Sequence, residues 1–303
     1  MKLEVKSHLD GILNNLSSSR LSTLSLTNNP IEVDGLASFP GRLEANELTE
    51  LHLSTCKLPP KAAECIAKFI AGSQSRNLVY LELNGNHLGA EGVRTIVDAI
   101  ESSNYGLIQV GLLANEEYPR STGDDDETRV QPREDYDPAQ EAIQLHHLVH
   151  ERLPELMFRN QFLTRRIRRA ALRTLVPARI LLNAQPLSDE ETARHVMAEV
   201  AAVTPNSTTP TLRTFRILDL PPEILHLVIR HCSQDPYALS ERQFVHLRTH
   251  AEGRESLSKI VKRRKERMVG IFSDEEEKEK EREMKDDWLR SGRWDKWEQN
   301  TTH

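Results

Sequence analysis

Residues 78–88 read LVYLELNGNHL, with leucines at positions 78, 81, 83 and 88 and an asparagine at position 86. Neither a helix period nor a strand period explains this spacing. It fits the pattern L-x-x-L-x-L-x-x-N/C-x-L, in which a short strand directs leucines inward. The side chain of Asn86 is then expected to satisfy backbone groups that the following bend leaves unpaired. One copy cannot bury its own leucines, so neighbouring copies are expected.

Three further copies of the pattern occur in the first 118 residues. The four copies begin at residues 21, 48, 78 and 107, so successive starts are 27, 30 and 29 residues apart. The second copy has Cys56 where the third has Asn86, and the fourth has Asn115. Apolar residues at helical spacing follow the second and third copies, around residues 66–70 and 93–100. A short strand is therefore expected to alternate with a helix.

This arrangement resembles the leucine-rich repeats of the ribonuclease-inhibitor type. The resemblance covers residues 1–118 and implies an α/β solenoid with a strand and a helix in each repeat. Residues 5–16 carry one apolar helical stripe, so either a helix caps the solenoid or the sequence begins partway through a longer one. Beyond Asn115 the sequence has no apolar stripe, so the solenoid is expected to end there without a fourth helix.

The residues that alternate with the leucines are expected on the concave face of the solenoid. Surfaces of this kind commonly bind proteins in repeat arrays. The candidate partner-binding residues are Thr23, Ser25, Glu50, His52, Tyr80, Glu82, Asn84 and Gln109. A mixed polar face with one tyrosine suits a loop of a partner protein, and the alternative is a face that contacts only solvent.

The remainder of the chain is expected to be mostly α-helical. Residues 119–138 form an acidic disordered linker, residues 139–270 a helical region, and residues 271–303 a charged helical tail containing three tryptophans. Arginines between residues 165 and 173 are expected on the solvent side of an amphipathic helix, and the alternative is that they bind RNA or an acidic membrane. His146 and His150 have a spacing that suits zinc, but a third ligand is missing, so no metal site is expected.

A proline-containing motif, LPPEIL at residues 220–225, opens an apolar helix. It resembles the opening of an F-box, a helical motif that docks onto the adaptor subunit of cullin-type ubiquitin ligases. The resemblance covers residues 217–232, and the second half of an F-box, with its usual valine and tryptophan, is absent. It implies adaptor contacts through Leu220, Pro221, Ile224, Leu225 and Ile229. The alternative is a helical hairpin that begins with the same residues and binds no adaptor.

The net charge, the hydropathy and the cysteine content of the chain limit its expected partners and location. A net charge of -6 over 303 residues argues against a general nucleic-acid binder, and no apolar run is long enough to span a bilayer. Three cysteines cannot form a closed disulfide framework, which favours a cytoplasmic or nuclear location. A basic cluster forms either a nuclear-import signal or a solvated helix face. Its residues are Lys262, Arg263, Arg264 and Lys265.

No nucleotide-binding, metalloprotease or nucleophile motif occurs in the sequence, so neither catalysis nor a cofactor is expected. The first hypothesis is a non-catalytic scaffold that binds other proteins through the repeats and the helical region. The second is an F-box-like substrate receptor of a cullin-type ubiquitin ligase. The third rests on resemblance to the activator of the Ran GTPase, which has this repeat type followed by acidic sequence but a much longer solenoid.

Overall fold

The computed structural model describes residues 21–31, 48–117, 136–183, 217, 220–253 and 274–298. The chain divides into two compact units, Met1–Thr164 and Arg165–His303. The four-part division expected from the sequence stays a prediction, because its boundaries near residues 118 and 270 fall outside the described residues.

Four short parallel strands form the sheet of the first unit. They are β1 (Thr23–Ser25), β2 (Glu50–His52), β3 (Tyr80–Glu82) and β4 (Gln109–Gly111), and they pair in chain order. The central residues of the strands lie opposite one another in the register, and they are Leu24, Leu51, Leu81 and Val110. Because the residues at either side of these positions point the other way, the leucines share one face of the sheet.

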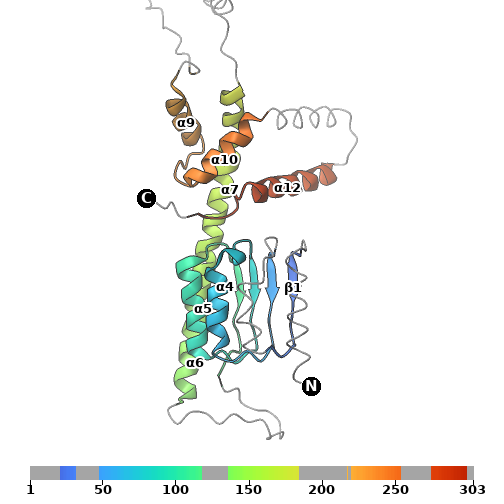
Figure 1. The fold of residues 1–303 in the computed structure, drawn as a ribbon, viewed down its shortest axis with the longest axis vertical. Coiled ribbons are helices and arrows are strands. Elements are labelled where there is room, and N and C mark those ends of the chain that lie inside the picture. Colours follow the sequence, from blue (N-terminus) through green and yellow to red (C-terminus); the bar gives the residue numbers. More distant parts are fainter. Residues whose placement is uncertain are drawn as a thin grey trace, which may run out of the picture. The chain divides into compact units, whose positions relative to one another are not determined.

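Helices cover the leucine face of this sheet. Parallel neighbours require a crossover connection, and α4 (Ala62–Ala71) and α5 (Gly89–Ser103) supply two of these, lying together on one side of the strands (Figure 1). Their apolar stripes are buried in the same core as the strand leucines. A side chain at Gly92 would place its Cβ 3.1 Å from the Cβ of Ala63, so two small residues allow the helices to approach closely.

A helix from beyond the acidic stretch completes this core. The helical run consists of α6 (Pro138–His146), the π-helical turn η3 (His147–Arg152) and α7 (Leu153–Asn183). Four of its leucines join the core of the repeats, and they are Leu145, Leu148, Leu153 and Leu156. The expectation that no fourth helix packs on the repeats was therefore wrong. The sequence pattern missed this helix because the acidic stretch separates it from the fourth strand.

A buried carboxylate holds α6 against the start of α5. Glu141 is 8% exposed, and its Oε1 accepts hydrogen bonds from the backbone N–H groups of Ala90 at 3.3 Å and Glu117 at 3.1 Å. Its Oε2 accepts from the hydroxyl of Tyr136 at 2.6 Å. A negative charge at this position also interacts favourably with the N-terminal end of the α5 dipole.

Two side chains of α7 hold the other end of α5. Asn160 is fully buried, and its Nδ2 donates to the carbonyl oxygens of Asn104 at 3.1 Å and Leu107 at 2.7 Å. The guanidinium of Arg159 donates to the carbonyl of Glu101 at 2.9 Å. The bonds to Glu101 and Asn104 satisfy carbonyl groups that the end of α5 leaves without intrahelical partners, and the bond to Leu107 holds the segment that leads into β4.

The side chain of Asn86 joins two successive repeats. Its Oδ1 accepts from the N–H groups of Cys56 at 2.9 Å and Leu58 at 3.1 Å. Its Nδ2 donates to the carbonyls of Leu53 at 2.9 Å and Leu83 at 2.8 Å. The amide is 1% exposed, so these four bonds satisfy backbone groups that cannot reach water. The role inferred from the repeat pattern is confirmed by this geometry.

The equivalent residues of the other repeats make similar bonds. Asn29 Nδ2 donates to the carbonyl of Leu26 at 3.1 Å, and the thiol of Cys56 donates to the same carbonyl at 3.1 Å. Asn115 Nδ2 donates to the carbonyl of Leu83 at 3.0 Å. Burial raises the pKa of the Cys56 thiol. The thiol therefore remains a hydrogen-bond donor, as the repeat position requires.

The residue before each of these polar side chains has a left-handed backbone. The residues and their φ angles are Asn28 (64°), Thr55 (53°), Gly85 (69°) and Ala114 (53°). This conformation disfavours side chains with a Cβ, above all β-branched ones such as that of threonine. A Cβ on Gly85 would lie 2.9 Å from Cγ2 of Thr55, so glycine is also required there by packing.

The second unit is a helical assembly with its own core. It contains α7 from Arg165 onward, α9 (Pro222–His231), α10 (Glu241–Glu252) and α12 (Asp274–Ser291). The buried side chains come from all four helices and include Ile167, Ala171, Ile229, Phe244, Leu247 and Leu289. The charged tail expected from the sequence therefore contributes an apolar residue to this core.

The segment after α12 is held by a buried tryptophan. Trp294 is 1% exposed, stacks on Trp288 with ring centroids 4.2 Å apart, and donates from Nε1 to the carbonyl of Gln243 at 3.0 Å. Gln243 Nε2 in turn donates to the carbonyl of Lys296 at 2.7 Å. Gln243 also forms the predicted capping box with Ser240 at the start of α10.

Replacement of Asn86 by alanine should strongly destabilise the repeats. Asn86→Ala leaves two buried N–H groups and two buried carbonyls without these partners, so a loss of about 3 kcal/mol or more in the free energy of unfolding is expected. Urea denaturation followed by circular dichroism measures this loss. The exposed control Ser25→Ala should change the free energy by less than about 0.5 kcal/mol. A loss below about 1 kcal/mol for Asn86→Ala would contradict the bridging role.

Candidate functional site

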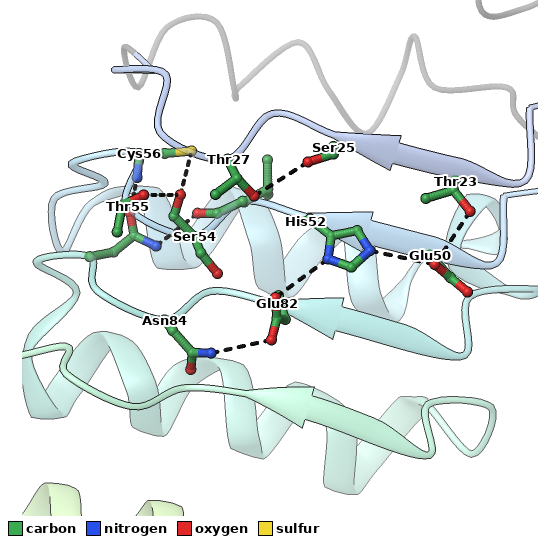
Figure 2. Close-up of polar contacts among 12 residues, drawn as sticks. Thr23, Ser25, Thr27, Glu50, His52, Ser54, Thr55, Cys56, Glu82 and Asn84 are labelled. Carbon is green, nitrogen blue, oxygen red and sulfur yellow. Dashed lines mark hydrogen bonds and ion pairs between the residues drawn. The ribbon is translucent and has the colours of Figure 1, made fainter.

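Six of the eight residues predicted for partner binding are labelled in Figure 2, on the face of the sheet opposite α4 and α5, and strand register places Tyr80 and Gln109 on the same face. Strand register arranges them in two rows that run across the strands. The first row is Thr23, Glu50, Tyr80 and Gln109, and the second is Ser25, His52, Glu82 and Gly111. Hydrogen bonds between adjacent backbones continue past the strands, which extends the face to a third row of Thr27, Ser54, Asn84 and Leu113. These three rows are called the polar face.

A chain of polar contacts runs across the polar face. The hydroxyl of Thr23 donates to Oε2 of Glu50 at 3.3 Å, and the same oxygen lies 3.5 Å from Nε2 of His52. Nδ1 of His52 lies 3.4 Å from Oε2 of Glu82, whose Oε1 accepts from Nδ2 of Asn84 at 3.4 Å. Both imidazole nitrogens therefore face carboxylates. An imidazole with one proton can donate to only one of them.

The polar face is acidic and carries one aromatic pair. The rings of His52 and Tyr80 lie 5.0 Å apart at their centroids and are tilted by 39°. A hydrogen bond with Glu82 raises the pKa of Tyr80, and burial and the charges of Glu82 and Glu50 act in the same direction. The three rows contain no lysine or arginine, so the two carboxylates determine the charge of this surface.

The third row contains a buried hydroxyl that no described group pairs. Ser54 is 9% exposed, and its Oγ makes no hydrogen bond in the described structure. The adjacent Asn84 is fixed, because its Oδ1 accepts from the N–H of Leu113 at 2.8 Å. A Cβ at Gly111 would lie 2.9 Å from this Oδ1, so glycine makes room for the amide. Alternation along β2 places Ser54 on the face, but the sequence holds no signal that its hydroxyl is unpaired.

The F-box-like segment opens with a helix that begins at Pro222. Pro221 precedes the helix, and its carbonyl accepts from the N–H groups of Ile224 at 2.9 Å and Leu225 at 3.0 Å. Pro222 occupies the first turn, where a missing N–H has no partner to lose. Leu220, just before the prolines, is partly exposed.

The apolar residues of α9 divide between the core and the surface. Ile229 is fully buried, and Leu225 packs against the same core. Ile224 is 43% exposed and Leu227, which the sequence analysis did not select, is 52% exposed. Of the residues predicted to contact an adaptor, Leu220, Pro221 and Ile224 are thus at the surface, whereas Ile229 packs inward.

Two arginines fix the loop between α9 and α10. Arg230 donates from Nε to the carbonyl of Pro236 at 2.7 Å and from Nη2 to that of Leu239 at 3.1 Å. Arg166 of α7 forms a two-pronged ion pair with Asp235, with Nε–Oδ2 and Nη2–Oδ1 distances of 2.5 and 2.9 Å. The hydrogen bond from Arg166 lowers the pKa of Asp235.

Other features singled out in the sequence are placed as follows. The basic cluster at residues 262–265 lies outside the described residues. The rings of His146 and His150 lie 4.8 Å apart, and the described part of the chain holds no group of three side chains suited to a metal ion. Among the described helices, none is both long and apolar enough to cross a membrane.

Comparison with known proteins finds similarity in two segments of the chain. A family model described as Leucine Rich repeat matches residues 74–97, and one described as F-box-like domain matches residues 196–278. The second match extends far beyond residues 217–232 and includes α10. A human protein, NACHT, LRR and PYD domains-containing protein 5, is 34% identical over 101 residues, which make up 33% of this chain and only 8% of that protein. No solved structure matches the chain.

The matched segments belong to families that are generally non-catalytic protein-interaction domains. The chain thus contains a segment similar to leucine-rich repeats and a segment similar to F-box-like domains, which together indicate a protein-interaction module.

The Arg166–Asp235 pair should make the second unit less stable in acid. Because the pKa of Asp235 is lowered in the folded protein, its pair with Arg166 stabilises above the ordinary aspartate pKa of about 3.9 and is lost as pH falls through the folded value. Asp235→Asn should therefore cost about 1 kcal/mol at pH 7, after allowance for solvent screening, and nothing near pH 2.

Thermal unfolding of the full chain between pH 7 and pH 2 measures this difference. Asp287→Asn is the matched control, because Asp287 is 76% exposed and lies 3.8 Å from Arg290. It should change stability by less than about 0.5 kcal/mol. An Asp235→Asn deficit that stays constant with pH would contradict the assignment.

Proposed function

We propose that this chain is a non-catalytic scaffold that joins two proteins. The repeats stack as a short solenoid and hold one partner on the polar face, and the F-box-like unit holds a second. The observation that carries the proposal is the polar face itself, where two carboxylates and an aromatic pair are partly exposed on strands fixed by the core behind them.

The rigidity of the polar face supports binding. Each three-residue strand is locked by the parallel ladder and by its central residue, which is buried in β1, β2 and β3 and partly buried in β4, so little chain entropy remains to be lost on association. Four strands are few for such a surface, so we infer that it accommodates one short segment of a partner rather than a whole domain.

Site-specific photocrosslinking tests this use of the face. A photoreactive amino acid in place of Tyr80 should yield a discrete protein adduct in cells, whereas one in place of Lys68, on the exposed side of α4, should not. The adduct should be at least about tenfold weaker when Glu50→Lys and Glu82→Lys are added, because both carboxylates are reversed. Equal adducts from both positions, or none from Tyr80, would contradict the proposal.

A second candidate function is that of a substrate receptor for a cullin-type ubiquitin ligase. The exposure of Ile224 and Leu227 on α9 favours it, because both lie in the segment that matches an F-box-like domain. In this reading the adaptor subunit of the ligase binds α9, and the polar face holds the substrate. The described four-stranded sheet offers no observation that favours a Ran-type GTPase activator.

Calorimetry with the purified adaptor subunit and the full chain tests this second function. Ile224→Asp and Leu227→Asp should each weaken binding by about tenfold or more, because a charge would enter an apolar contact. Val245→Asp is the control, because Val245 is also exposed, at 40%, but lies on α10. No binding by the folded chain, or equal loss in the control, would rule out the receptor function and leave the scaffold.

A further inference from the structure

We propose that the polar face recognises an arginine side chain of the partner, held by Glu82 and Ser54 beside the His52–Tyr80 ring pair. This inference rests on the proposed function of the face, and it specifies the chemistry of what is bound there.

First, the carboxylates of Glu50 and Glu82 can accept more hydrogen bonds than an imidazole with one proton can donate. His52 lies between Glu50 and Glu82, with nitrogen–oxygen distances of 3.5 and 3.4 Å. An imidazole with one proton leaves one of these contacts without a hydrogen, so a carboxylate oxygen remains available to an outside donor. No lysine or arginine stands in the three rows, so a cationic donor from a partner suits this position.

The second step is the hydroxyl of Ser54. Its Oγ is buried in the floor of the face and has no hydrogen-bond partner among the described residues, which is a costly state for a polar group. Ser54 follows His52 by two residues on the same face, and the backbone N–H of Thr55 donates to the carbonyl of Asn84 at 2.8 Å. The hydroxyl therefore belongs to the row next to Glu82, and because its Oγ is covered, contact with a ligand held by Glu82 requires the Ser54 side chain to turn toward that ligand.

The third step is the shape of the donor. A guanidinium presents five N–H groups in a planar fork, so one ligand can reach both the carboxylate and the hydroxyl. Its plane can also lie against aromatic rings, and the His52–Tyr80 pair is on the same face, with His52 only 22% exposed. An ammonium group lacks this planar fork, which makes arginine the better fit than lysine.

Nuclear magnetic resonance of the full chain with short peptides tests the inference. The probe is Ac-Gly-Ser-Arg-Ser-Gly-amide, and the ring signals of His52 and Tyr80 report its binding. These signals should shift saturably with the arginine peptide. A peptide with citrulline, which keeps the shape and lacks the charge, should bind at least about tenfold more weakly, and a lysine peptide should lie between the two.

Two variants separate recognition from stability. Glu82→Gln should weaken the arginine peptide by about tenfold or more, whereas Glu64→Gln on the exposed side of α4 should not change its affinity. Ser54→Ala should weaken it by about two- to fivefold while leaving the unfolding temperature equal or higher, because the buried hydroxyl pairs with none of the residues that the structure describes. A lower unfolding temperature for Ser54→Ala would show that the hydroxyl is structural and overturn its role here.

The peptide and crosslinking results together distinguish a failure of arginine recognition from a failure of partner binding by the polar face. Equal binding of the arginine and citrulline peptides, or no effect of Glu82→Gln, overturns the recognition of arginine. A Tyr80 photoadduct that persists in excess arginine peptide also overturns the recognition of arginine. It would still show that the polar face binds a partner. Absence of both the adduct and the peptide shifts overturns both proposals.

Discussion

The first unit depends on hydrogen bonds that cross from one repeat to the next. A three-residue strand and its bend leave buried N–H and carbonyl groups that cannot reach water. The amide of Asn86 satisfies four of them at once, one in its own repeat and three in the preceding repeat. Because it joins backbone groups of two repeats, it fixes the strand register. That register sets the leucines in one column and the polar face in rows.

The same constraint explains why α6 and α7 belong with the repeats. The last repeat exposes an apolar column and the ends of α5 unless another helix covers them. Leucines of the later helix supply the apolar cover, while Glu141 and Asn160 satisfy the backbone groups at the two ends. A helix separated by an acidic stretch can do this because the cost of closing a loop rises only slowly with its length.

In the second unit, as in the strands of the first, some apolar or polar side chains of an element face the core and others face the surface. The helix α9 gives Ile229 to the core and leaves Ile224 at the surface, and two arginines hold the loop that follows. The buried Trp294 adds the end of the charged tail to this core. Binding through α9 is therefore compatible with a stable unit, since the exposed side chains are different from those that hold it together.

The sequence by itself determined the repeat, its strands and the residues of the polar face, because a two-residue alternation and a recurring leucine pattern are local properties. It also indicated the amide role of Asn86. Only the tertiary structure showed the helix that completes the repeats, the left-handed Thr55, the inward position of Ile229 and the unpaired hydroxyl of Ser54. These features depend on which segments distant in sequence meet, and contacts between distant segments leave no periodic signal in the chain.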